Sequence, residues 1–497
     1  MTTSWKKALT SCLSLALIVA GPIGRVSAET ADLPDIGSPA DAVLTKSEER
    51  QIGRMVLRGL REAGRLVSDP EINEYINDLG HRLVGLAHEG EHDFTFFVVA
   101  DPAINAFALP GGYIGFNAGL ILAAETESEL AGVAAHEISH VTQNHIERQI
   151  YASSKASLIS AAAMLAAILV GAATDAGGDA IAGAIAVGQG TAMQQQINFT
   201  RAHEYEADRV GIGLLHAAGF DPAGMPDFFE TLGRRNSTTP GRVPEFLMTH
   251  PVTSARIAET RNRASKLEDV GDVTDSINFR LAQERLRVLN ATTPSSVLSY
   301  YKGNEFSEDE LAPIQYGTAL ALMASGDSAG AETILQELLN GNQGVIAYHS
   351  ALAQAQMLSD KNSQSLETFE RAIGLFPRNV PLTIRYSEAL LRAGLAKEAH
   401  ILLLDLLNNI YPTPEQARLI ALAASAAGDT ADAHYYMSEY HILNGDLLSA
   451  VHQLQLARAV PELDPVQGAK FQARLEEIME YIPEKDRARI AHNSPVR

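Results

Sequence analysis

The stretch VAAHEISHVT, residues 133–142, carries two histidines four positions apart, with a glutamate directly after the first. On an α-helix, positions i and i+4 are about 40° apart, so His136 and His140 share a face and can bind one metal ion. Glu137 is rotated by about 100° from His136 and can reach a water at that ion, as a general base must. The stretch predicts a catalytic metal-binding helix. The alternative is a helix that carries this pattern by chance.

A catalytic zinc site usually has three protein ligands and one open position. HEYEAD, residues 203–208, supplies candidates for the third ligand, because Glu204 and Asp208 share a helix face whereas Glu206 points away. In one interpretation Glu204 binds the ion, and Asp208 holds a ligand histidine in its tautomer. The alternative is a solvated acidic helix start. The mostly apolar continuation, residues 209–220, favours a buried helix, in which carboxylates need partners.

The flanking patterns predict the elements around this helix. Apolar residues spaced three and four apart predict helices over 44–86, and the aromatic, β-branched DFTFFVVAD (93–101) predicts a strand. The turn residues 110–112 (Pro-Gly-Gly) predict either a hairpin or a strand with a tight corner within 104–121. A capping box of Thr126 and Glu129 predicts that the HEISH helix begins near Glu127. Further helices are expected over 200–220, ending at Gly219, and from residue 254 onward.

Residues 156–174 contain no charged side chain, and a second apolar run follows at 180–190. Three interpretations compete for 156–196: a helical hairpin that covers the active site, a segment that dips into a membrane surface, or a membrane span. Each of the three would place an apolar element beside the predicted catalytic site.

The C-terminal part repeats with a period of 34 residues, seen in the turn residues Gly326, Asp360, Gly394 and Gly428. Small residues recur seven and five positions before each turn and five after it, where two helices of a pair would touch. This period resembles the tetratricopeptide repeat, a stack of helix pairs with a concave groove for peptides or proteins. The alternative is an irregular helical bundle.

Composition limits the remaining possibilities. A positive start at Lys6 and Lys7, a short apolar run and the small-x-small pattern ending at Ala28 predict a cleaved signal peptide over 1–28. Its removal would also remove the single cysteine, Cys12, so the exported chain could form no disulfide. The net charge of −21 argues against nucleic acid and against electrostatic binding to anionic lipid.

Together, HEISH, the ExxxD pattern of EYEADRVG (204–211) and NAFALPGGYIGFNAGLI (105–121) resemble the zinc metallopeptidase family of the CAAX-prenyl protease and HtpX heat-shock protease type. The order of signal peptide, peptidase domain and repeats is similar to that of the family's periplasmic β-barrel assembly-enhancing members. The resemblance implies one Zn²⁺ per chain, with a side-chain role for each matching residue. By this resemblance, His136, His140 and Glu204 are the zinc ligands. Glu137 is the general base, and Asp208 holds a ligand histidine without touching the ion.

The stretch MTHPVTSAR, residues 248–256, also matches these relatives. It implies that His250 either stabilises the oxyanion of the scissile carbonyl or occupies the open zinc position and holds the enzyme inactive. Arg256 is a candidate second oxyanion donor. The strand around Asn105–Leu109 would pair with the substrate backbone.

The sequence thus predicts a mainly α protein. An α+β, zincin-like metallopeptidase domain with a small sheet (29–268) precedes an α-solenoid of tetratricopeptide repeats (269–497). The expected function is a periplasmic zinc endopeptidase that cleaves unfolded or misassembled outer-membrane β-barrel proteins. Its repeats would bind these clients or the β-barrel assembly machinery, and 156–174 would make a peripheral membrane contact. The alternative is a chaperone or scaffold that acts mainly through the repeats.

Overall fold

The computed structural model describes residues 45–87, 93–152, 201–238, 245–268, 270–271, 273–308 and 310–482, together with Glu484 and Arg487. The predicted signal peptide (1–28) and the apolar segment 156–196 lie outside these residues. Among the described residues, no helix is both long enough and apolar enough to cross a membrane.

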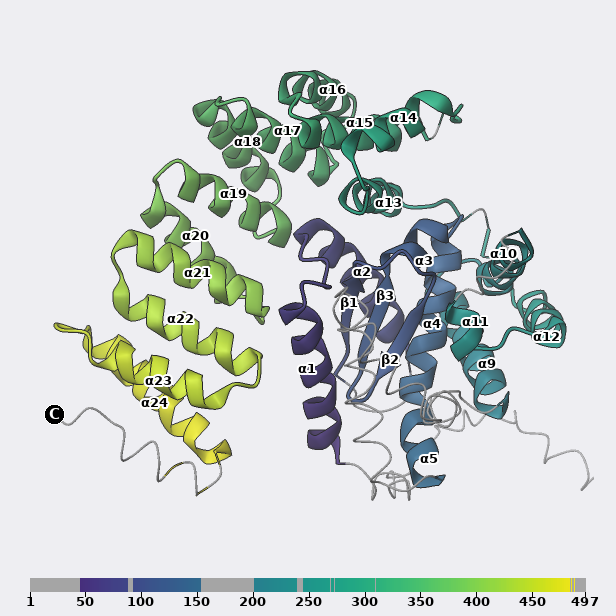
Figure 1. Cartoon of the computed structure of the whole chain (residues 1–497), viewed down its shortest axis with the longest axis horizontal. Coiled ribbons are helices and arrows are strands. Elements are labelled where there is room, and N and C mark those ends of the chain that lie inside the picture. The colour runs from purple at the N-terminus through teal and green to yellow at the C-terminus, as the bar shows by residue number, and fades with distance from the viewer. Residues whose placement is uncertain are drawn as a thin grey trace, which may run out of the picture. The chain divides into compact units, whose positions relative to one another are not determined.

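The N-terminal part combines helices with one small sheet (Figure 1). Its elements are α1 (Lys46–Glu62), α2 (Pro70–Val84), β1 (Thr95–Val99), β2 (Ala106–Leu109), β3 (Tyr113–Asn117), α3 (Ala118–Ala123), α4 (Glu127–Thr142), α5 (His145–Ala152), α9 (Arg201–Ala217), α10 (Gly224–Thr238), α11 (Glu245–Thr249) and α12 (Ser254–Ala264).

The three strands are ordered β1-β3-β2, with β1 parallel and β2 antiparallel to β3. The predicted hairpin is confirmed, because β2 and β3 are joined through Gly111 and Gly112. Both glycines have φ of +79°, a conformation that side chains with a Cβ rarely adopt. Since β2 has only one neighbour in this order, it is the edge of the sheet that lies on the α4 side (Figure 1).

Helix α4 begins at Glu127, as the sequence predicted, and the Thr126 hydroxyl accepts a hydrogen bond from the Glu129 amide. The reciprocal half of the capping box is wrong: the Glu129 carboxylate accepts from the Glu125 amide at 2.6 Å. All sixteen residues of α4 are buried. A helix buried on every side is held in one position by its neighbours, which is what a metal site requires.

One hydrophobic core surrounds α4. It includes Leu79 of α2, Phe116 of β3, Leu215 of α9 and Phe228 of α10, all buried. Helix α9 approaches α4 closely at Gly211, where a Cβ would lie 3.2 Å from the Ala135 backbone. This close approach brings the acidic start of α9 beside the HEISH face.

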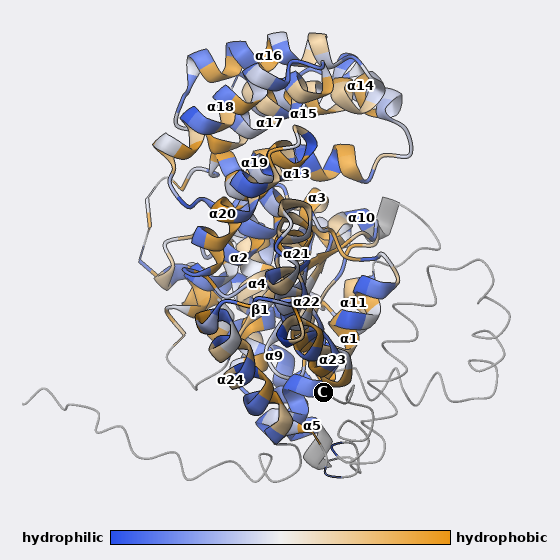
Figure 2. Ribbon diagram, turned by 90° about the vertical axis from the view of Figure 1, so that its left-hand side faces the viewer, coloured by the Kyte–Doolittle hydropathy of each residue, from blue (hydrophilic) through white to orange (hydrophobic). Residues whose placement is uncertain are grey.

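The C-terminal part is a run of antiparallel helix pairs, which confirms the predicted solenoid. Its helices are α13 (Ile277–Leu289), α14 (Pro294–Gly303), α15 (Leu311–Ser325), α16 (Ser328–Gly341), α17 (Ile346–Leu358), α18 (Asn362–Leu375), α19 (Val380–Arg392), α20 (Ala396–Leu407), α21 (Pro414–Ala427), α22 (Thr430–Leu443), α23 (Leu447–Arg458) and α24 (Pro465–Tyr481). Polar and apolar residues are interleaved along these helices, as the colours of Figure 2 show.

The predicted turn residues all have positive φ: Gly326 (+92°), Asp360 (+59°), Gly394 (+78°) and Gly428 (+87°). Each therefore ends the first helix of a pair in the left-handed conformation. Helix α13 differs from the sequence-based division, because its Phe279 belongs to the core around α4.

Candidate metal centre and active site

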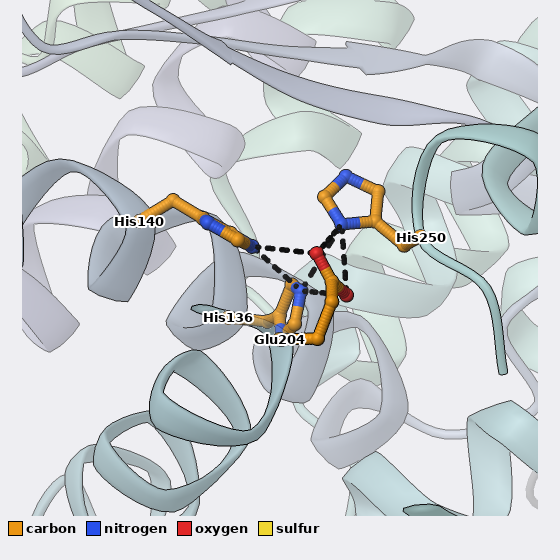
Figure 3. Close-up of side chains that lie close together, drawn as sticks. All are labelled: His136, His140, Glu204 and His250. Atoms are coloured by element: carbon orange, nitrogen blue, oxygen red, sulfur yellow. Dashed lines mark hydrogen bonds and ion pairs between the residues drawn. The ribbon is translucent and has the colours of Figure 1, made fainter. Parts of the chain in front are cut away.

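Four buried side chains from three separate segments point toward one another (Figure 3). His136 and His140 come from α4, Glu204 from α9, and His250 from the residue that follows α11. The Nε2 atoms of His136 and His140 are 3.0 Å apart, and each lies 3.6 Å from a Glu204 carboxylate oxygen. His250 Nδ1 lies 3.2 Å from Glu204 Oε1 and 3.3 Å from His136 Nε2.

These separations fit donors that share one ion. Two ligands of a tetrahedral zinc with bonds of about 2.1 Å are about 3.4 Å apart. The spacings of 3.0 to 3.6 Å within the cluster lie on both sides of that value. Three nitrogens and a carboxylate are also the donor types that zinc prefers. The residues therefore fit the metal that the sequence pattern implies.

Glu137 lies beside this cluster and is fully buried. Neither of its carboxylate oxygens has a hydrogen-bond partner among the described residues, and Oε1 lies 3.5 Å from His250 Nε2. A buried carboxylate without a hydrogen-bond partner is unfavourable unless the site itself supplies a donor such as a water. This position is the one that a general base beside a metal would occupy.

The electrostatics favour metal binding at two of the donors. Burial and then the neighbouring His136 lower the pKa of His140 well below its usual value, so its imidazole is neutral. Burial raises the pKa of Glu204, but the nearby His250 and His136 outweigh it and hold that pKa well below its usual range. Burial lowers the pKa of His136, while the adjacent Asp208 and Glu204 carboxylates raise it to about 9. Metal binding at His136 would therefore displace a proton.

Asp208 and Arg256 lie behind the cluster. Asp208 Oδ1 is 3.0 Å from His136 Nδ1, the ring nitrogen that faces away from the other donors. The Arg256 guanidinium donates to both oxygens of Asp208, at 2.7 and 2.8 Å, and to Glu204 Oε2 at 2.8 Å. It also donates to the Pro251 carbonyl. The guanidinium is thus bonded to the carboxylates that hold the site, which does not favour a role as oxyanion donor.

His145, which sequence reasoning assigned to no function, contacts the site. Its Nδ1 lies 2.9 Å from Nδ1 of His140, and its Nε2 lies 3.2 Å from Glu206 Oε2. On a continuous helix His145 would point about 140° away from His140. The helix is broken instead, because α4 ends at Thr142 and Asn144 has φ of +51°. An asparagine after an apolar helix was the signal for this break.

Comparison with known proteins agrees with this geometry. The family model described as "Peptidase family M48" matches residues 70–264, which include all the residues of the cluster. The mitochondrial metalloendopeptidase OMA1 of Arabidopsis thaliana is 30% identical over 154 residues, which cover 31% of this chain and 28% of the relative.

Two relatives align over most of their length. The β-barrel assembly-enhancing protease of Escherichia coli strain K12 is 33% identical over 482 residues, covering 95% of this chain and 96% of the relative. A putative β-barrel assembly-enhancing protease of Vibrio cholerae serotype O1 is 33% identical over 473 residues, covering 94% and 96%. With this identity over nearly the whole chain, and with the M48 match over the metal-binding cluster, the chain belongs to the β-barrel assembly-enhancing protease family and is a metallopeptidase.

Proposed function

We propose that the chain is a zinc endopeptidase of the periplasm that cleaves misassembled outer-membrane β-barrel proteins. The observation that carries this proposal is the convergence of His136, His140 and Glu204 on one point. Beside them lies the Glu137 carboxylate, which has no hydrogen-bond partner among the described residues. The client class rests on the relatives' names, and the periplasm on the predicted signal peptide over residues 1–28.

The proposed roles follow from the contacts. His136, His140 and Glu204 bind the ion, which when bound polarises a peptide carbonyl and acidifies water. Glu137 takes the proton of the attacking water and passes it to the leaving amine. Asp208 fixes the tautomer of His136, because a carboxylate oxygen 3.0 Å from Nδ1 favours the proton on that nitrogen and leaves Nε2 free as a donor to the metal. Arg256 is a positioning residue that keeps both carboxylates charged and oriented.

His250 has the geometry of a fourth donor. Its Nδ1 lies 3.3 Å from His136 Nε2 and 3.2 Å from Glu204 Oε1, within the 3.0 to 3.6 Å range found among the three proposed ligands. We infer that this arrangement is a latent state, in which His250 occupies the position that a substrate carbonyl or water needs. Its contact with the base Glu137 through Nε2 supports the same inference, since one side chain then blocks both functional groups.

The edge strand β2 is the proposed docking line for substrate. Residues Ala106–Leu109 pair on one side with β3, and a strand has hydrogen-bonding groups for two neighbours. An extended client segment can add to the other side by β-augmentation. Unfolded β-barrel strands are suited to such pairing. We propose that the repeats, through their concave surface, bind clients or the assembly machinery.

The experiment is a metal analysis of the purified mature chain, without added metal, beside His140→Ala and Glu137→Gln. We expect His140→Ala to lose about one equivalent of zinc per chain, and Glu137→Gln to keep it but not to cleave unfolded β-barrel protein. Equal zinc in the wild type and in His140→Ala would overturn the ligand assignment. Parental cleavage by Glu137→Gln would overturn the role of the base. Full support of barrel assembly in cells by Glu137→Gln would favour the scaffold function of the repeats.

A further inference from the structure

A second group of metal-ligand side chains lies in the repeats, far along the chain from the catalytic cluster. His400 belongs to α20, Asp429 is the N-cap of α22, and Asp432 lies in the first turn of α22. One donor atom from each of the three lies within 4.8 Å of the others. His400 and Asp432 are each 7% exposed, so this is not a solvated acidic surface.

The imidazole of His400 is the observation that points to a ligand. Its Nε2 is buried and has no hydrogen-bond partner among the described residues. The nearest carboxylate oxygen, Asp432 Oδ2, is 3.4 Å away. That distance is longer than a normal hydrogen bond, yet it is about the separation of two ligands that share a tetrahedral ion.

The two carboxylates are held in place by other bonds and each keeps an oxygen for a ligand. Asp429 Oδ1 accepts from the Asp432 amide at 2.9 Å, so this oxygen caps α22. Asp432 Oδ1 accepts from Nε2 of Gln467 on α24 at 3.1 Å. The remaining oxygen of each acid is not used in these contacts. Ligands oriented by second bonds are typical of metal sites.

A cavity of about 520 Å³ adjoins two of the three side chains, those of His400 and Asp429. Gln467 and Lys397 also line it. The cavity gives an ion a path of entry and room for water or for a further ligand. A binding site needs both, whereas a closed ion pair needs neither.

We propose that His400, Asp429 and Asp432 bind a divalent transition metal of the zinc class, with its remaining coordination positions open to the cavity. One imidazole and two carboxylates suit zinc better than calcium or magnesium, which prefer oxygen ligands alone. The ion would join α20 to α22, and through Gln467 it would reach α24. Because each repeat of a solenoid contacts only its neighbours, such a link would stiffen the C-terminal repeats locally.

The test counts zinc on the full-length chain after equilibration with micromolar zinc. We expect about two equivalents for the wild type, and about one for His400→Gln and for Asp432→Asn, with cleavage of unfolded protein kept in both variants. His452→Ala is the control, because it removes an exposed histidine of the next helix, and it should keep two equivalents. One equivalent in the wild type, or two in His400→Gln, would overturn the proposal.

A second measurement needs no variant. Anomalous scattering at the zinc edge from zinc-soaked crystals of the wild-type chain should show a peak between His400 and Asp432. A peak at His136, His140 and Glu204 alone would overturn the proposed site and leave the catalytic assignment intact. The absence of a peak at the catalytic cluster would instead count against the proposed peptidase mechanism.

Discussion

The Nδ1 atoms of His140 and His145 lie 2.9 Å apart, and the far nitrogen of His145 lies 3.2 Å from the Glu206 carboxylate. Burial and the adjacent His203 lower the pKa of His145 to about 4, so its ring is neutral and has one N–H to donate. All three groups are satisfied when His140 donates to His145 and His145 donates to Glu206. The lone pair of His140 Nε2 then points toward the centre of the cluster, where a metal ion would bind.

The first prediction follows from this contact. His145→Ala should weaken zinc binding by about 10–100-fold, the usual effect of removing a side chain that orients a ligand. A competition titration with a chromogenic chelator measures the affinity. Excess zinc should restore cleavage if the variant is folded. His216→Ala is the control, because His216 lies in the last turn of α9, whereas the ligand Glu204 lies in the first. This variant should bind zinc as the wild type does. An unchanged affinity in His145→Ala would show that the contact has no orienting role.

The second prediction concerns Arg256, which is bonded to Asp208 and Glu204 in the core. Arg256→Met would leave both carboxylates without their cation and should lower the free energy of unfolding by about 3–5 kcal/mol. Urea unfolding measures the loss. Arg261→Met on the same helix is the matched control, because its ion pairs with Asp227 and Glu230 are solvent-exposed. We expect it to cost about 0–1 kcal/mol. Equal losses of unfolding free energy in the two variants would contradict the expected difference between a buried and an exposed ion pair.

The third prediction concerns pH. Burial, and then the nearby Glu49, raise the pKa of Glu147 to about 7, while Lys46 acts weakly in the opposite direction. Because this pKa is above the unfolded value of 4.5, the folded state binds more protons between these two pH values. The stabilisation is therefore complete below about pH 4.5 and is lost as the pH rises through about 7.

Glu147→Gln should remove this contribution and flatten the fall of unfolding free energy between pH 5 and about 7. Urea titrations at several pH values measure the slope. Glu62→Gln, an exposed change on α1, should leave the slope as it is. A steeper fall in Glu147→Gln than in the wild type would have the wrong sign for a raised pKa.

The fourth prediction separates the two roles of His250. If this residue blocks the site, His250→Ala should raise the cleavage rate. The increase is about tenfold for every 1.4 kcal/mol by which the blocked state is favoured. A fluorogenic assay with an unfolded client measures the rate, and Glu137→Gln combined with His250→Ala should be inactive. A fall in the rate with unchanged substrate affinity would instead identify His250 as the oxyanion donor.

Local signals in the sequence predicted much of the fold correctly. The Thr126 cap fixed the start of α4, and the turn residues at Gly326 and Gly394 adopt the left-handed conformation that the 34-residue period required. These features depend on a few neighbouring residues, so a sequence pattern is enough to find them. The pairing of His136 with His140 is local in the same sense, since it follows from the helical repeat alone.

The rest of the site depends on tertiary packing. His250 is 114 positions from His136, and sequence spacing alone could not place a nitrogen of each ring 3.3 Å apart. Only the family resemblance suggested that His250 lies near the metal. The sequence suggested Arg256 as a second oxyanion donor. No sequence pattern shows which carboxylates a buried guanidinium contacts, so its bonds to Asp208 and Glu204 could not be foreseen. His145 was missed because an angle computed on a continuous helix does not apply across the break at Asn144.

The complete burial of α4 has a consequence for how its backbone exchanges with solvent. An amide that no local opening exposes can exchange its hydrogen for deuterium only when the whole core unfolds. The amides of HEISH should therefore be among the slowest in the chain, whether or not a metal is bound. Removal of the ion would then change side-chain order at the site while the helix itself stays protected. A chain that has lost its metal would remain ready to take it up again.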